Sequence, residues 1–152
     1  MTVDGRKDAK DIVVGDVLIS MAINDEAVND PTFNWIAWSQ EGLALNETNM
    51  RTTTVIGVSS YNTSQLYLLN GDLYSESHYI LTKKDNVSKF IRVDQIDNSY
   101  MVYSYSELGF VNIDSLEVVE YEDTVYSINC EPYDNFFTEN MLVFDARDPE
   151  SY

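Results

Sequence analysis

Hydrophobic and polar positions alternate along most of the chain, in short runs rich in β-branched and aromatic residues. Turn-forming residues separate these runs at intervals of about ten residues, and a period of two puts alternate side chains on one face of a strand. No long amphipathic helix interrupts the pattern, which predicts an all-β fold of short antiparallel strands and hairpins. The predicted strands cover residues 11–21, 33–39, 51–60, 66–69, 73–74, 78–82, 90–93, 100–105, 110–119, 124–130, 135–137 and 141–144. In the second of them, Phe33, Trp35 and Ala37 share one face.

Two glycines give more local predictions. Asn70-Gly71 separates two apolar runs, and this pair best tolerates the two positive φ angles of a type I′ turn, so we expect a hairpin there. Gly57 lies inside a Thr- and Val-rich run, where a glycine usually marks a bulge or a close backbone approach. We therefore expect a kinked strand over residues 51–60.

Length and composition assign these strands to one domain. The chain has 152 residues, of which 44% are hydrophobic and 12% aromatic, so it can bury a core without disulfides. Because no polar linker is long enough to separate two domains, we expect a single β domain over residues 1–146. Residues 147–152 follow as a polar C-terminal tail that contains Asp-Pro.

The charge balance argues against several classes of partner. Asp and Glu outnumber Lys and Arg by 26 to 9, which gives a net charge of −17, and residues 93–146 contain no Lys or Arg. Since such a chain repels phosphate backbones and anionic lipid, we expect neither a nucleic-acid partner nor a membrane. No window approaches the ~18 apolar residues of a membrane span, and no secretion signal is visible. An acidic mimic of DNA that occupies a protein groove by charge stays open as a minor alternative.

Few residues are available for metal or cofactor chemistry. One cysteine, Cys130, and one histidine, His78, cannot assemble a zinc site of the usual type, and a single thiol fits a reducing compartment. The acidic loop over residues 24–31 lacks the glycine and the distal glutamate of an EF-hand. We therefore expect no metal and no cofactor, and we expect Cys130 to be a buried, inert thiol.

Any mechanism that needs an imidazole must use His78. A serine hydrolase would also need a strained turn such as Gly-x-Ser-x-Gly, and the chain has none. A lone histidine at the start of a strand is equally typical of a half-exposed residue with an ordinary hydrogen bond. The acidic residues that could serve as paired carboxylates are typical of the solvated side of a strand and its turn; they are Glu117, Glu120, Glu122 and Asp123.

Three segments, in this order and at these spacings, resemble blocks of the Hint domain, the fold of inteins and of Hedgehog-type autoprocessing domains. The start contains Val3-Asp4-Gly5 and then Val14-Gly15-Asp16-Val17, similar to the opening strand, turn and second strand. The middle, Ser75-Glu76-Ser77-His78, resembles the Thr-x-x-His block, and residues 125–128, 135–137 and 141–143 resemble the closing β segments. The resemblance spans nearly the whole chain and implies termini that lie close together, with Met1 to Gly5 near residues 141–144.

The resemblance also implies roles for single residues. In an intein, a Cys or Ser at the first position attacks the preceding carbonyl, while the Thr-x-x-His block polarises the scissile amide and protonates its leaving nitrogen. This chain begins at Met1 and supplies no such nucleophile. Ser75 and His78 are therefore expected to be a vestigial amide-activating block.

The C-terminal junction departs further from the Hint pattern. The pattern ends in Val-His-Asn before a Cys, Ser or Thr, so that the Asn amide cyclises with help from the His. In this chain Val143 is followed by Phe144, Asp145 and Ala146. Because Phe144 cannot donate a proton, an ionised Asp145 cyclises poorly, and Ala146 has no hydroxyl or thiol, we expect a degenerate junction, no splicing and no catalytic residue.

These expectations lead to a non-catalytic structural or interaction module with a degenerate Hint-like fold. Hint-like modules with degenerate ends resemble those embedded in virion structural proteins of tailed phages. We therefore expect a virion component that is assembled in a reducing cytoplasm. Its 11 tyrosines are suited to contacts with protein, either copies of itself or neighbouring virion proteins. The alternative is an autoprocessing Hint domain that cleaves at an N-terminal junction whose Cys or Ser lies outside this chain.

Overall fold

The computed structural model describes residues 1–23, 34–76 and 78–145. This part of the chain consists of antiparallel strands and short 3₁₀ helices, and none of its helices is long and apolar enough to cross a membrane. The predicted all-β fold is confirmed. The strands are β1 (Val17–Met21), β2 (Gln40–Glu41), β3 (Met50–Leu69), β4 (Asp72–Tyr74), β5 (His78–Lys84), β6 (Val87–Arg92), β7 (Met101–Ser104), β8 (Gly109–Asn112), β9 (Leu116–Glu131), β10 (Asn135–Phe137) and β11 (Leu142–Asp145), and the 3₁₀ helices are η1 (Ala9–Asp11), η3 (Glu47–Asn49) and η4 (Val93–Gln95).

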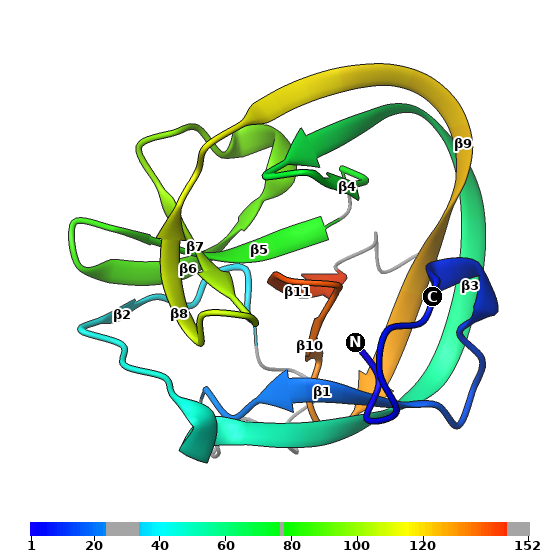
Figure 1. Cartoon of the computed structure of the whole chain (residues 1–152), viewed down its shortest axis with the longest axis horizontal. Helices are drawn as coiled ribbons and strands as arrows, with labels where there is room; N and C mark the ends of the chain where they lie inside the picture. Colours follow the sequence, from blue (N-terminus) through cyan, green and yellow to red (C-terminus); the bar gives the residue numbers. More distant parts are fainter. Residues whose placement is uncertain (24–33, 77, 146–152) are drawn as a thin grey trace.

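Two sheets organise these strands (Figure 1). In one sheet β3 pairs with β1, β4 and β9, and in the other the order is β10-β11-β5-β6-β2, with β7 paired to β5 and β8 to β7. The two longest strands pair from Leu69 opposite Leu116 to Thr54 opposite Glu131. Figure 1 shows them as a curved ribbon, here called the β3–β9 arch, that bends around β4, β5 and β11.

Both glycine predictions are confirmed. Asn70 and Gly71 have φ angles of 47° and 89°, and Leu69 pairs with Asp72, so a two-residue turn joins β3 to β4. The register of β3 on β9 shifts between Val55 and Gly57, which is the expected bulge.

The strand predicted over residues 33–39 is wrong where the structure describes it. Residue 33 lies outside the described residues, and residues 35–37 form a turn. The Asn34 Oδ1 accepts the N–H groups of Ile36 and Ala37 at 3.1 and 3.3 Å. This side chain offers the backbone a local alternative to a sheet ladder, which the alternation of apolar residues could not reveal.

The strand predicted over residues 11–21 is shorter than expected, because β1 begins only at Val17. The Asp16 Oδ2 accepts the Val13 N–H at 3.0 Å and binds the Lys7 Nζ at 2.8 Å, so the preceding residues form a turn. Val13 and Val14 are more than half exposed as a result.

Longer strands replace several of the predicted short ones. Predicted strands 51–60 and 66–69 form the single strand β3, and predicted strand 110–119 is broken between β8 and β9. At this break the Asn70 Oδ1 accepts the N–H groups of Asp114 and Ser115, at 2.7 and 3.1 Å. The hairpin turn therefore also sets the start of β9, a long-range contact that has no signature in the local sequence.

The core has two parts, on opposite faces of the central strands β5, β10 and β11. Successive residues of a strand point to opposite faces. Ile80, Phe136 and Val143 belong to one buried cluster, whereas the residues adjacent to them belong to the other; these are Leu81, Phe137 and Leu142. The three central strands are therefore buried on both faces.

Asn135 ties β10 to β1 inside this core. Its side chain is buried, its Oδ1 accepts the Met21 N–H at 2.9 Å, and its Nδ2 donates to the Met21 carbonyl at 3.0 Å. One amide thus satisfies both backbone groups of the last residue of β1.

Replacing Asn135 by Ala should lower the free energy of unfolding by about 2–4 kcal/mol, because both Met21 groups lose their partner in a dry site. Asn62→Ala is the matched control, since Asn62 is exposed and its Oδ1 accepts a hydrogen bond from Thr124 on the surface. The control should cost less than about 1 kcal/mol. Urea unfolding followed by tryptophan fluorescence measures both variants, and equal losses would contradict the bridging role of Asn135.

Candidate functional site

Ser75 and His78 lie where β4 ends and β5 begins. The His78 N–H donates to the Ser75 carbonyl at 3.1 Å and closes the turn between them. The Ser75 N–H donates to the His78 Nδ1 at 3.2 Å, and the Ser75 Oγ lies 3.0 Å from the same nitrogen. The three-residue spacing thus folds the serine back onto the imidazole, so the two residues singled out from the sequence are in direct contact.

Two tyrosines complete the surroundings of this pair. Tyr61, on the β3–β9 arch, has its hydroxyl 2.9 Å from the Ser75 Oγ. The Tyr74 ring meets the imidazole of His78 edge-on, with 5.7 Å between the ring centroids. Burial raises the pKa of the Tyr74 hydroxyl, which also pairs with the Thr138 hydroxyl at 3.1 Å.

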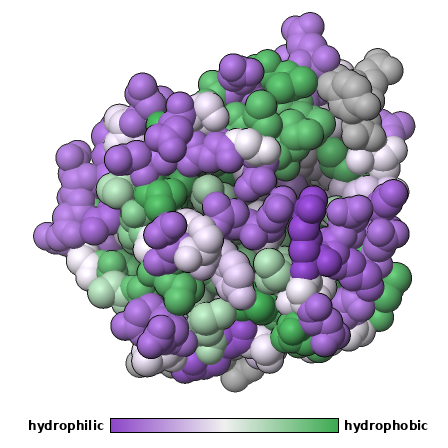
Figure 2. Space-filling model, in the orientation of Figure 1, coloured by the Kyte–Doolittle hydropathy of each residue, from purple (hydrophilic) through white to green (hydrophobic). Residues whose placement is uncertain are grey.

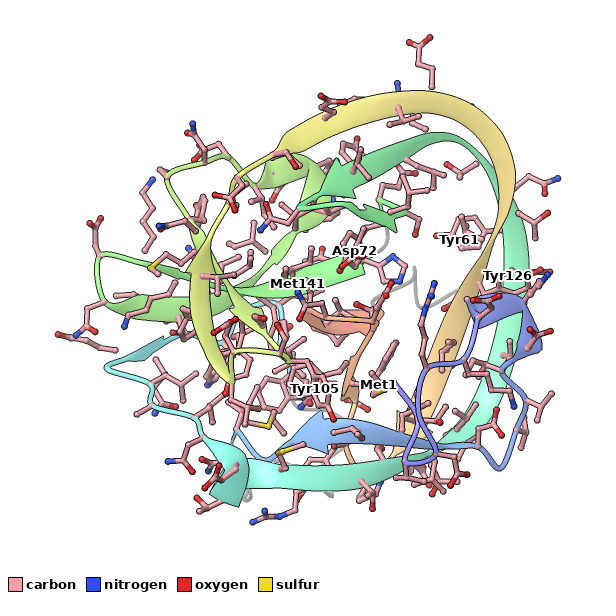
Figure 3. All side chains as sticks on the ribbon, in the orientation of Figure 1. Met1, Tyr61, Asp72, Tyr105, Tyr126 and Met141 are labelled. Atoms are coloured by element: carbon pink, nitrogen blue, oxygen red, sulfur yellow. The ribbon has the colours of Figure 1, made fainter. Side chains whose placement is uncertain are left out.

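The pair lines a cavity of about 330 Å³. Other parts of its wall come from residues 6–9, from β9 and from residues 136–139, and Met1 contributes as well. The Met1 amino group donates to the carbonyls of Phe137 and Thr138, at 2.6 and 3.1 Å. Figure 3 shows Met1 facing the interior of the β3–β9 arch, with Tyr61 and Tyr126 on the arch itself. The start of the chain therefore contacts the β10–β11 hairpin, which agrees with the expected closeness of Met1 to the closing β segments.

Burial dominates the electrostatics around the cavity. It lowers the pKa of the Met1 amino group to about 6, against the opposing effect of the Glu139 carboxylate. Burial also raises the pKa of the Asp72 carboxyl on β4, an effect that Glu139 increases and Arg6 reduces. Because the neutral forms of both groups are favoured relative to water, hydrogen bonds in this region act in a poorly hydrated environment.

No metal centre accompanies this site within residues 1–23, 34–76 and 78–145, since no three His, Cys, Asp or Glu side chains there are grouped to hold an ion. The acidic loop over residues 24–31 lies outside the described residues. Cys130 is buried on β9, as the sequence indicated.

Phe144 occupies a structural position rather than an open junction. It is 8% exposed, stacks on Tyr79 with 5.0 Å between ring centroids, and meets Phe90 edge-on at 4.9 Å. In the β11–β5 ladder, Phe144 pairs with Tyr79 and Asp145 pairs with His78. Because paired residues share a face and successive residues alternate, the Phe144 ring lies on the face opposite to that of His78.

The three residues that the sequence predicts as a degenerate junction thus differ in their relation to the site. The backbone of Asp145 lies directly across from His78, Phe144 points away from it, and Ala146 lies outside the described residues. The packing role of Phe144 and the contact of Tyr61 with Ser75 were not predicted from the sequence. The sequence has no signal for the Tyr61 contact, because residues 61 and 75 are brought together by the tertiary fold. It has none for Phe144 either, because the face of β11 on which this side chain lies is set by strand pairing.

Phe144→His should lower the free energy of unfolding by about 2–4 kcal/mol, because a polar ring would replace a packed apolar one between Tyr79 and Phe90. Phe144→Leu keeps an apolar side chain at the same position and should cost clearly less. Urea unfolding curves compare the two variants. A histidine variant as stable as the leucine variant would show that the ring of residue 144 is not enclosed as described.

Comparisons with solved structures agree with this architecture. A bacterial intein-like domain from Clostridium thermocellum is similar with a TM-score of 0.64 and 14% identity, over 95% of this chain and 91% of that chain. A DnaB intein from Synechocystis sp. PCC 6803 matches with a TM-score of 0.54 and 17% identity, over 89% and 98% of the two chains. The transcription factor IIB Mvu mini-intein matches with the same score and identity, over 85% and 95%. No family model and no curated protein matches the chain by sequence. The likeness in structure shows that this chain has the all-β, Hint-like fold of intein-like domains.

Proposed function

We propose that this chain is a non-splicing module of the Hint-like fold that acts by binding protein and keeps a remnant of the N-terminal amide-activating block. The observation that carries the proposal is the position of Phe144, in the core on the face opposite to His78. An intein needs an imidazole and a cyclising Asn at its C-terminal junction. Here an aromatic side chain that packs in the core stands where that imidazole would be, so this position offers no proton donor.

The surface supports a role in binding. Leu73 on β4 and Val118 on β9 are 56% and 58% exposed; Leu73 pairs with Leu68 and Val118 pairs with Tyr67 of β3, so they lie on opposite faces of this sheet. Figure 2 shows a hydrophobic patch near the top of the molecule, over the region of the arch and β4, on a face that is otherwise largely hydrophilic. A contiguous exposed hydrophobic patch favours contacts with protein. The proposed partners are copies of this chain or neighbouring proteins of a phage particle, and the virion assignment rests on the resemblance alone.

The 152-residue chain should keep its full mass through prolonged incubation with thiol or hydroxylamine, because no ester or thioester forms without a nucleophile next to a scissile amide. Intact-mass spectrometry measures this, with His78→Ala as the parallel variant. A shorter species that appears in the original chain and not in the His78→Ala chain would overturn the non-catalytic proposal.

The second candidate function is N-terminal autoprocessing, with a Cys or Ser upstream of these residues as the nucleophile. It is favoured by one observation: Met1, Ser75 and His78 all line the same cavity. In this reaction the upstream thiol would attack the carbonyl carbon of the residue before it. The amide C–N bond breaks, the leaving nitrogen takes a proton, for which His78 is the proposed donor, and a thioester remains for a second thiol to cleave.

A chain extended upstream of Met1 by a reporter segment and a Cys should therefore release the reporter slowly when thiol is added. We expect slow release because a displacement of about 1 Å in such a site costs roughly a hundredfold in rate. His78→Ala in the extended chain should abolish the release, and the C-terminal side should stay uncleaved. Gel electrophoresis and mass spectrometry over several days measure the release of the reporter. An extended chain that remains whole eliminates this second candidate.

A further inference from the structure

The turn between β3 and β4 contains the one asparagine of the chain that precedes a glycine, Asn70-Gly71. Asparagine is a chemically labile residue, and a following glycine has no Cβ to obstruct attack of its nitrogen on the side-chain amide. We infer that Asn70 is a deamidation site that the native turn keeps closed, and that its reaction makes an opening of this turn irreversible.

The reaction needs only water as a co-reactant. The Gly71 nitrogen forms a bond to the Asn70 Cγ, and the bond from Cγ to Nδ2 breaks. Ammonia leaves with the proton that the Gly71 nitrogen gives up, and a five-membered succinimide remains. Water then opens this ring at either carbonyl, so residue 70 becomes an aspartate or an isoaspartate. In the isoaspartate, the former side-chain carbons belong to the main chain.

The backbone of the turn holds the reacting atoms apart. The positive φ angles of 47° at Asn70 and 89° at Gly71 are those of a type I′ turn, in which ψ of the first central residue is about +30°. This ψ places the Gly71 nitrogen and the Asn70 Cβ on opposite sides of the Cα–C bond. Ring closure needs both on the same side, so the turn must open by rotation about this bond before the nitrogen reaches Cγ.

Hydrogen bonds hold the Asn70 side chain against residues 112–115. Its Nδ2 donates to the Asn112 carbonyl at 3.1 Å, and its Oδ1 accepts the N–H groups of Asp114 and Ser115, at 2.7 and 3.1 Å. The Asn70 N–H donates to the Ser115 carbonyl at 2.9 Å and fixes the backbone beside them. The rotation that brings the Gly71 nitrogen to Cγ breaks these contacts, here called the Asn70 bridge.

Neither product can rebuild the Asn70 bridge. An aspartate has no side-chain N–H, so a carboxylate oxygen would face the Asn112 carbonyl, and two acceptors without a proton between them repel each other. The new negative charge would also lie close to Asp72 and Asp114, in a chain of net charge −17. An isoaspartate lengthens the main chain, which a two-residue turn cannot accommodate. A turn that has opened and reacted therefore cannot close as before.

The first test measures the reaction in the 152-residue chain at mildly alkaline pH. One sample is folded and another is kept in urea above the unfolding transition. Peptide mapping by mass spectrometry counts asparagine, aspartate and isoaspartate at position 70. In urea, position 70 should react before every other asparagine, whereas in the folded chain its rate should be at least about tenfold lower, because opening must precede attack. Equal rates in the two samples, or an earlier reaction of another asparagine in urea, would overturn the inference.

A pair of variants tests whether the Asn70 bridge itself keeps the site closed. Asp114→Pro removes the N–H that lies 2.7 Å from the Asn70 Oδ1, whereas Asp114→Ala removes the same carboxylate and keeps that N–H. With both variants folded by circular dichroism, the proline variant should react at position 70 about three- to tenfold faster. Equal rates would contradict the role of the bridge. If the proline variant does not fold, the next pair of variants still tests the bridge.

Asn70→Asp reproduces one product of the reaction, and Asn62→Asp is its matched control. The control adds the same charge on the same strand, and the Oδ1 of the exposed Asn62 accepts from the Thr124 hydroxyl, which a carboxylate can also do. Urea unfolding followed by tryptophan fluorescence should show a lower midpoint for Asn70→Asp and a nearly unchanged one for Asn62→Asp. Equal midpoints would overturn the irreversible step, since a reacted turn could then close again.

Discussion

The three central strands, β5, β10 and β11, are buried on both faces, and most other features of the molecule depend on this constraint. A strand with one wet face can alternate apolar and polar residues, but a strand enclosed on both faces must be apolar in succession. The pairs Ile80-Leu81 and Phe136-Phe137 and the run from Met141 to Phe144 meet this requirement. The remaining strands, including the β3–β9 arch, surround these three and take their positions from them.

Burial on both faces also separates His78 from Phe144, which lie on opposite faces of β5 and β11. His78 lines the cavity, and its backbone pairs with that of Asp145 in the β11–β5 ladder. On the other face, Phe144 packs with Tyr79 and Phe90. Because a single residue step along a strand reverses the face, the chain keeps its imidazole beside the cavity while the preceding residue of the closing strand serves only the core.

Hydrogen bonds, rather than ion pairs, connect the side chains of Tyr61, Ser75 and His78 at the site. The cavity lies in a molecule with a net charge of −17, yet burial rather than net charge has the largest effect on the pKa of Met1 and of Asp72. In such surroundings a group that can only donate a hydrogen bond restricts the role of the group that it contacts. The Ser75 N–H is such a donor: it lies 3.2 Å from the His78 Nδ1, and the Ser75 hydroxyl lies within hydrogen-bond distance of both this nitrogen and the Tyr61 hydroxyl.

The sequence by itself determined the features that depend on local chemistry. Period-two alternation gave the all-β class, the positive φ angles that Asn70-Gly71 tolerates gave a hairpin, and Gly57 gave a bulge, because each of these is decided within a few residues. It also pointed to Ser75 and His78, whose contact needs only one turn. Tertiary structure alone decided that β9 starts where Asn70 accepts two N–H groups, that Phe144 lies in the core, and that Tyr61 reaches Ser75. Each of these depends on which distant group, or which of two sheet faces, competes for a residue, and no local pattern encodes the outcome of that competition.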